Sequence, residues 1–212
     1  MKLAVLISGS GSNLQAFIDS CNNGEVPAEI AVVFSNRADA GGLARAEAAG
    51  IDTVVIDHKG FDTREDFDTA LVAALAPHAP DLVILAGFMR ILSPVFISAF
   101  RGRLLNIHPS LLPKYPGLHT HQRAIDAGDR HGGATVHFVT EELDGGPPVL
   151  HARVPIESGD DAEALAQRVL QWEHLIYPLA AQWFAEGRLE LASDGARLDG
   201  QRLPAEGVEY LG

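Results

Sequence analysis

The chain has 212 residues, a length that suits one large domain or one domain with a short extension. Apolar residues make up 47% and charged residues 21% of the sequence, which is typical of a globular protein with a substantial core and excludes a disordered or fibrous chain. The formal net charge of −12 argues against nucleic acid as a partner, because a negative surface repels polyanions.

The N-terminal segment is not typical of a secretion signal or a membrane anchor. Its first apolar run, residues 3–7, ends at Ser8-Gly9 and is too short for either, and no later stretch is long enough. The single cysteine, Cys21, cannot form an internal disulfide and lacks the Cys and His spacing of a zinc site. These features predict a cytoplasmic protein with no bound metal.

Short apolar strands alternate with helices through the first half of the chain. The predicted strands are residues 3–7, 31–34, 53–56 and 82–85, and the predicted helices are 14–21, 42–49 and 61–75. Strands without polar alternation are buried on both faces. The pattern therefore predicts an α/β fold, a Rossmann-like and mostly parallel sheet with helices on both faces.

The pattern changes after residue 100. A strand is predicted at 104–108, a long loop rich in proline and histidine follows it, and further strands are expected at 135–139 and 149–154. Residues 162–186 have near-helical apolar spacing, which predicts one long amphipathic helix with Pro178 near a bend. A terminal hairpin is expected within 189–203. Without linkers or repeats, residues 1–212 are expected to form a single domain.

Polar groups that follow strands are the first candidates for a site, because ligands of open α/β sheets bind at the carboxyl ends of the strands. The first strand is followed by Ser8-Gly9-Ser10-Gly11-Ser12-Asn13, where glycines admit a phosphate to the backbone and helix N–H groups can bind it. Leu14 replaces the third glycine of a dinucleotide fingerprint, so a phosphate monoester fits better than NAD. A turn with a helix cap explains the same residues without a ligand.

The second candidate segment, residues 87–94, follows the most apolar strand. Apolar side chains flank a single cation in Gly87-Phe88-Met89-Arg90-Ile91-Leu92-Ser93-Pro94, an arrangement that suits a pocket for a flat heterocycle. The alternative is a helix start with Ser93 as N-cap and Pro94 at the first position. That alternative leaves Arg90 unexplained.

The third candidate is the end of the strand at 104–108. Period-two alternation places Asn106 and His108 on one face, where both can reach one reacting atom. Asparagine can donate a hydrogen bond to a developing oxyanion, and histidine can donate a proton and positive charge. A structural histidine before a rigid proline loop is the alternative. Ser110 is not expected to be a nucleophile, because the chain has no Gly-x-Ser-x-Gly elbow.

The fourth candidate, residues 141–147, places acidic side chains beside Gly145-Gly146-Pro147. Such a composition is typical of a solvated turn. The carboxylate of Asp144, held in such a turn, would also orient His108 and favour its cationic form. The other histidines of the loop region are interpreted as solvated, because no His-Glu-x-x-His or cysteine pair accompanies them.

Together, residues 8–14, 87–94, 104–117 and 137–147 resemble the phosphoribosylglycinamide formyltransferases, a folate-dependent family of purine synthesis. The likeness covers essentially the whole chain. Asn-x-His with a downstream Asp-Gly-Gly is shared by the wider group of formyltetrahydrofolate enzymes, and the Gly-Ser-Asn loop and the length narrow the choice. The resemblance implies transfer of a formyl group from 10-formyltetrahydrofolate, as co-substrate, to the amine of glycinamide ribonucleotide, without a metal or a covalent enzyme intermediate.

The resemblance also implies roles for individual residues. The catalytic set would be Asn106, His108 and Asp144. The ribonucleotide would contact Gly11, Ser12, Asn13 and Glu173. The folate would contact Arg64, Met89, Arg90, Ile91, Leu92, Thr140 and Asp144. Leu170 occupies a position where the family commonly has a polar or basic residue. Phosphate binding would fall to about 1–100, and folate binding and catalysis to about 101–212.

Three alternative functions are weighed against this one. A formyltetrahydrofolate hydrolase would direct the same residues at water, but that family has an additional N-terminal domain. Methionyl-tRNA formyltransferase has an added RNA-contacting domain, which the net charge of −12 also opposes. A noncatalytic nucleotide sensor does not need Asn106 and His108 together. We expect a monomer or homodimer that binds small-molecule substrates, with neither nucleic acid nor membrane as a partner.

Overall fold

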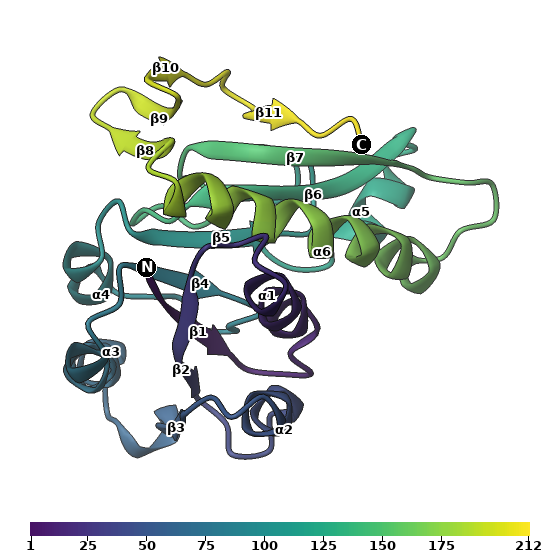
Figure 1. The fold of residues 1–212 in the computed structure, drawn as a ribbon. Helices are drawn as coiled ribbons and strands as arrows, with labels where there is room; N and C mark the ends of the chain where they lie inside the picture. The colour runs from purple at the N-terminus through teal and green to yellow at the C-terminus, as the bar shows by residue number, and fades with distance from the viewer. The chain divides into compact units, whose positions relative to one another are not determined.

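The computed structural model describes residues 1–212, and the chain divides into two compact units, Met1–Asn106 and Ile107–Gly212. The boundary falls within one strand, β5 (Leu104–His108). Each unit has its own pattern of strands and helices, coloured from purple to teal and from teal to yellow in Figure 1.

The first unit is a parallel sheet with the strand order β5-β4-β1-β2-β3 (Figure 1). Helices connect its strands, with α1 and α2 on one side of the sheet and α3 and α4 on the other. Besides β5, the strands are β1 (Lys2–Ile7), β2 (Glu29–Ser35), β3 (Thr53–Val55) and β4 (Leu82–Leu85). The helices are α1 (Ser12–Asn22), α2 (Gly41–Ala48), α3 (Arg64–Leu75) and α4 (Pro94–Ala99), with 3-10 turns at His58–Gly60 and Ala76–His78.

Burial follows the position of each strand in this sheet. The central strands β1 and β4 are apolar throughout their buried stretches because helices cover both faces, and Leu3 to Ile7 have no exposed surface. On α1, the buried apolar residues Leu14, Phe17 and Ile18 recur at helical spacing. The predicted α/β fold, with a mostly parallel sheet and helices on both faces, is confirmed.

The second unit combines an antiparallel pair of strands with one long helix. Strand β6 (His131–Phe138) pairs with β7 (Pro148–Pro155), and β11 (Val208–Glu209) runs parallel to β7. Helix α6 (Ala162–Ala185) packs against β6 and β7 through a buried stripe that includes Leu165, Val169 and Ile176. The Asp161 carboxylate caps this helix by accepting a hydrogen bond from Ala164 N at 2.8 Å.

Several elements differ from the sequence-based expectation. The region of His119 and His121, interpreted as loop, contains α5 (Thr120–Asp126). Strand β6 starts four residues earlier than predicted, and the helix predicted from residue 61 starts at Arg64, after the Thr63 cap. The terminal hairpin has a third strand, because β8 (Leu189–Ala192), β9 (Gly195–Leu198) and β10 (Gln201–Arg202) pair in turn. No helix is both long and apolar enough to cross a membrane.

Candidate functional site

The first unit has a pocket of about 480 Å³ at the carboxyl ends of its strands. The Ser8–Asn13 turn after β1 and the Gly87–Arg90 segment after β4 both line it, so two of the four predicted segments meet there. The pocket thus brings the predicted phosphate residues Gly11, Ser12 and Asn13 together with Met89 and Arg90 of the predicted folate set.

Gly11 is required by the backbone of the turn. Its φ of 73° lies in the left-handed region, and a Cβ there would stand 2.5 Å from the Cα of Gly42 on α2. Gly11 is also the N-cap of α1 and provides no side-chain cap, which leaves the first N–H groups of the helix available to an anion. Arg45 of α2 donates from Nε to the Ser10 carbonyl at 2.9 Å and brings positive charge to the turn.

The segment that carries the predicted folate residues is held at both ends. Met89 N donates to Ser8 Oγ at 2.8 Å, and Ser93 N donates to a carboxylate oxygen of Asp68 on α3. Between these anchors, the side chains of Met89 and Ile91 are 67% and 56% exposed, whereas Leu92 is buried. Met89 and Ile91 therefore offer apolar surface to a ligand, and Leu92 supports the segment from the core.

Asp68 is an acid buried on α3, and burial is the largest influence on its ionisation. Desolvation raises the pKa of the Asp68 carboxyl, and the hydrogen bonds from Ser93 oppose the rise. Ser93 is the N-cap of α4 and Pro94 its first residue, as the helix-start alternative predicted. The carboxylate of Asp68 on α3 thus holds the backbone of the residue that precedes α4.

In the second unit, His108 and Asp144 form a buried pair. The distance from His108 Nδ1 to Asp144 Oδ2 is 3.5 Å, and the two side chains are 7% and 9% exposed. His108 Nε2 lies 2.8 Å from the Tyr115 carbonyl oxygen, which can only accept a hydrogen bond. The ring therefore has its Nε2–H directed at a carbonyl and its Nδ1 directed at a carboxylate, an arrangement that suits a cation.

The turn that carries Asp144 is built on backbone constraints. Asp144 itself has a φ of 51°, a left-handed conformation that Asp and Asn tolerate better than most residues. Its Oδ2 accepts from Gly117 N at 2.9 Å, which links the turn to the loop after β5. A Cβ on Gly146 would overlap the Phe138 carbonyl oxygen at the end of β6, so the turn requires glycine there.

His137 is a second histidine beside Asp144. Its Nε2 is 3.9 Å from Asp144 Oδ1, and its Nδ1 donates to the Phe138 carbonyl at 2.9 Å. Burial lowers the pKa of His137 to about 4, against the opposing influence of the Phe138 carbonyl and Asp144. His137 is therefore neutral at pH 7, which leaves His108 as the partner of Asp144 suited to carry positive charge.

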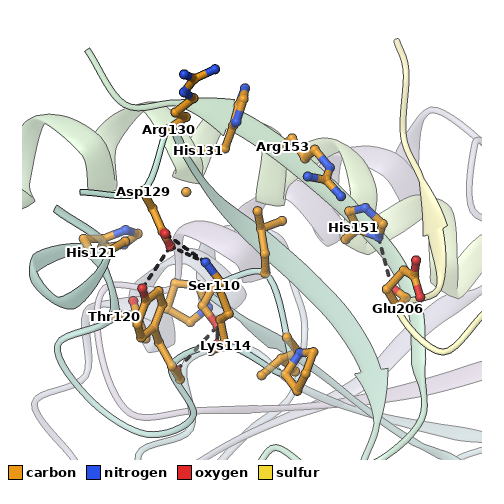
Figure 2. A pocket seen from close by; sticks show the side chains of 17 residues that line it. Ser110, Lys114, Thr120, His121, Asp129, Arg130, His131, His151, Arg153 and Glu206 are labelled. Atoms are coloured by element: carbon orange, nitrogen blue, oxygen red, sulfur yellow. Dashed lines mark hydrogen bonds and ion pairs between the residues drawn. The ribbon is translucent and has the colours of Figure 1, made fainter. Parts of the chain in front are cut away.

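The loop after β5 also forms one wall of a second cavity, of about 380 Å³, which Figure 2 shows. Lys114 Nζ lies 2.8 Å from both carboxylate oxygens of Asp129, and the Tyr115 hydroxyl donates to Asp129 at 2.9 Å. On the other side of the cavity, His151 Nδ1 donates to the Glu206 carbonyl at 3.0 Å. Asp129 thus anchors the loop whose Tyr115 carbonyl orients His108.

The remaining predicted residues are placed as follows. Asn106 is the last residue of the first unit and half-buried on β5. Glu173 is buried on α6, and Leu170 lies on the same helix. Arg64 begins α3 and approaches Glu65 at 3.5 Å, and Thr140 follows β6. Within the second unit, the structure brings His108 and Asp144 together, as expected from the sequence.

Sequence reasoning missed several groups that shape these sites. The Tyr115 carbonyl is a backbone atom, and Asp68 lies in a helix without a motif, so neither had a signal in the sequence. Asn36 follows β2 and His58 follows β3, positions that the carboxyl-end rule for ligand sites would have singled out.

A protein-family model described as "Formyl transferase" matches residues 1–181. The match covers most of the chain, and the chain therefore belongs to the formyl transferase family. The predictions that the chain has a formyltransferase fold and is an enzyme that transfers a one-carbon group are confirmed.

The relatives narrow the family further. The chain is 56% identical over 207 residues to the phosphoribosylglycinamide formyltransferase of Escherichia coli (strain K12), with 98% of each chain covered. It is 53% identical to the Haemophilus influenzae protein of that name, with 97% of each covered. The structure of the Coxiella burnetii phosphoribosylglycinamide formyltransferase in complex with CHES aligns with a TM-score of 0.95 at 47% identity, over 99% of each chain. The structure of glycinamide ribonucleotide transformylase 1 from Symbiobacterium toebii aligns with a TM-score of 0.91 at 48% identity, over 93% of each chain.

Proposed function

We propose that the chain transfers the formyl group of 10-formyltetrahydrofolate to the amine of glycinamide ribonucleotide in purine biosynthesis. The observation that carries this proposal is the buried His108 and Asp144 pair, 3.5 Å apart, in a chain whose relatives named phosphoribosylglycinamide formyltransferase match it over 98% and 97% of its length. The pocket beside the Gly-Ser turn supports it, because a phosphate monoester suits a helix N-terminus.

The proposed reaction is a direct attack of the substrate amine on the formyl carbon. Asn106 donates a hydrogen bond to the oxyanion of the tetrahedral intermediate, and His108 stabilises it as a cation that Asp144 supports. Collapse of the intermediate breaks the bond from the formyl carbon to N10 of the folate, while a proton passes from the amine to N10. Holding the two reactants together contributes roughly 7–11 kcal/mol, so positioning is the main task of the enzyme.

The binding residues are proposed in two groups. Gly11, Ser12 and Asn13 bind the phosphate of the ribonucleotide, and Glu173 binds its sugar hydroxyls. The folate is bound by the segment with Met89, Arg90, Ile91 and Leu92, by Thr140 and Asp144, and at its glutamate tail by Arg64. The exposure of Met89 and Ile91 supports the folate assignment, because apolar side chains that face solvent gain from contact with a ring system.

The reaction is proposed to need small molecules alone, with 10-formyltetrahydrofolate as co-substrate and no metal. Residues 1–212 would act as one domain, as monomer or homodimer, in the cytoplasm.

The experiment that tests the function follows deformylation of 10-formyltetrahydrofolate with and without glycinamide ribonucleotide. We expect folate product only when the ribonucleotide is present, in a one-to-one ratio with formylated ribonucleotide. Equal rates with and without the ribonucleotide would support a hydrolase instead. Tight binding of the ribonucleotide without turnover would support a noncatalytic sensor.

A further inference from the structure

A line of hydrogen bonds joins four residues that line the first-unit pocket. Met89 N donates to Ser8 Oγ at 2.8 Å, and the Ser8 hydroxyl donates to Asn36 Oδ1 at 2.6 Å. The line ends at His58, whose Nδ1 lies 3.1 Å from Asn36 Nδ2. The residues that these three bonds join are 81, 28 and 22 positions apart in the sequence.

The order of the strands explains this line. Met89 follows β4, Ser8 follows β1, Asn36 follows β2 and His58 follows β3, and these strands are neighbours in the order β4-β1-β2-β3. One hydrogen bond therefore spans each gap between adjacent strands at their carboxyl ends. Ser8 and Asn36 are 5% and 3% exposed, so water cannot replace a lost partner without cost.

The directions of these hydrogen bonds determine which ring nitrogen of His58 carries the proton. The single hydroxyl proton of Ser8 goes to Asn36 Oδ1, so Ser8 Oγ accepts from Met89 N. The Nδ2 of Asn36 can only donate, so Nδ1 of His58 is the acceptor and its proton lies on Nε2.

The other neighbours of His58 are poorer partners for Nδ1. The Asn36 carbonyl oxygen is 3.3 Å away, and Asp57 Oδ1 is 3.7 Å away and already accepts from Lys59 N. The ring of Phe67 on α3 meets the imidazole edge to face at 6.3 Å. A proton on Nδ1 would turn that atom toward these oxygens and leave Asn36 Nδ2 without its acceptor.

We propose that His58 is a positioning residue for the folate. Through Asn36 and Ser8 it fixes the backbone N–H of Met89, and with it the orientation of the Gly87–Arg90 segment that the proposed function assigns to folate. All four members of the line border the pocket of about 480 Å³. Ser8 is the first residue of the phosphate turn, and the residues after it have separate supports, since Gly42 N donates to Gly9 O at 3.0 Å and Arg45 Nε to Ser10 O at 2.9 Å. Loss of His58 therefore affects the folate more than the ribonucleotide.

Three substitutions of His58 distinguish positioning from simple packing. H58N places an amide oxygen where Nδ1 stood and keeps the acceptor, H58Q moves the amide to the place of Nε2, and H58A removes it. We expect H58A and H58Q to raise the KM for 10-formyltetrahydrofolate about tenfold, or about 1.4 kcal/mol, with kcat and the KM for the ribonucleotide within twofold. H58N should return the folate KM to within twofold of the parent. The matched control is H78A, because His78 is half-buried outside the line and packs on Phe34.

Nuclear magnetic resonance tests the line without any substrate. In the free protein, neutral His58 should show an unprotonated Nδ1 and a protonated Nε2 by ¹⁵N shifts, and the Met89 amide signal should move in H58A and return in H58N. A protonated Nδ1 in the neutral ring, an unmoved Met89 amide, or an H58N enzyme as impaired as H58A would overturn the proposal. If the parent enzyme does not transfer formyl groups, the proposed function fails, and the Met89 amide still decides whether the line exists.

Discussion

Asp144 has a conformation that makes one substitution especially informative. Its φ of 51° suits Asn as well as Asp, so D144N keeps the turn and removes only the charge that faces His108 at 3.5 Å. Without that charge the cationic imidazole that the proposed mechanism requires is less favoured. We expect kcat to fall at least tenfold at pH 7.

The same experiment is completed by H108A and the double variant. Because the two side chains act as a unit, H108A with D144N should be little worse than H108A alone. Kinetics of all four proteins at pH 7 are the measurement. Fully additive losses would assign Asp144 to folate binding alone.

Ile91 tests the folate segment at a site where folding does not interfere. Its side chain is 56% exposed, so I91D should leave stability within about 0.5 kcal/mol. A carboxylate placed against an apolar ring is poorly solvated, and we expect folate binding to weaken at least tenfold with ribonucleotide binding retained. Calorimetry with each ligand is the measurement. V95D, at an exposed residue of α4, is the matched control, and the opposite selectivity would exchange the two proposed sites.

Among elements, the turn between β6 and β7 offers two adjacent glycines with different surroundings. A Cβ on Gly146 would overlap the Phe138 carbonyl, whereas the atoms nearest to a Cβ on Gly145 belong to the flexible Glu142 side chain. We expect G146A to lower the free energy of unfolding by about 1–3 kcal/mol and kcat at least tenfold, because Asp144 shifts with the turn. G145A should stay within twofold in kcat. Urea unfolding and kinetics of both variants decide this, and equal effects would remove the Gly146 contact as the cause.

The start of α1 is the element proposed to bind phosphate, and Ser12 is a better probe of it than Gly11. Valine at Gly11 would strike the backbone of Gly42, so its effect would not be specific to the ligand. In S12D a carboxylate joins the first helical turn, where it stabilises the helix by about 0.3–1 kcal/mol and repels a phosphate. We expect an unfolding midpoint no lower than the parent's and a KM for the ribonucleotide raised at least tenfold. The controls are S12A, which lacks the added charge, and the folate KM of both variants. An unchanged ribonucleotide KM in S12D would place the phosphate elsewhere.

The elements that sequence predicted are those whose signal is local. Apolar runs located β1 and β4, and the Thr63 and Asp161 caps determine where α3 and α6 begin. Helix α5 escaped prediction because it is short, with only Thr120 and Ala124 buried, and two-residue β11 is defined by backbone pairing with β7. The line from Met89 to His58 needs the strand order, which a sequence without an alignment does not give.

At the scale of the whole molecule, the stability of the chain should depend on pH in two separate windows. His137 is neutral when folded, with a pKa lowered to about 4 by burial, and an unfolded histidine titrates near 6.5. The unfolded state therefore takes up the proton first, and stability is lost as pH falls from 6.5 to about 4. The hydrogen bonds from Arg168 lower the pKa of Asp160 from its ordinary 3.8 to about 2. The stability that this carboxylate contributes is therefore lost only as the pH falls below 3.8.

These windows can be separated with H137Q and D160N. We expect the parent to lose roughly 3 kcal/mol between pH 6.5 and 4 through His137, a loss that H137Q avoids because glutamine takes up no proton. Any pH-independent change from the altered packing adds a constant to the difference in stability between parent and H137Q and leaves its dependence on pH unchanged. D160N should leave that upper window intact and flatten the curve only below about pH 4. Urea unfolding from pH 3 to 8 is the measurement, and a difference between parent and H137Q that stays constant across pH 4 to 6.5 would mean that His137 is charged in the folded protein.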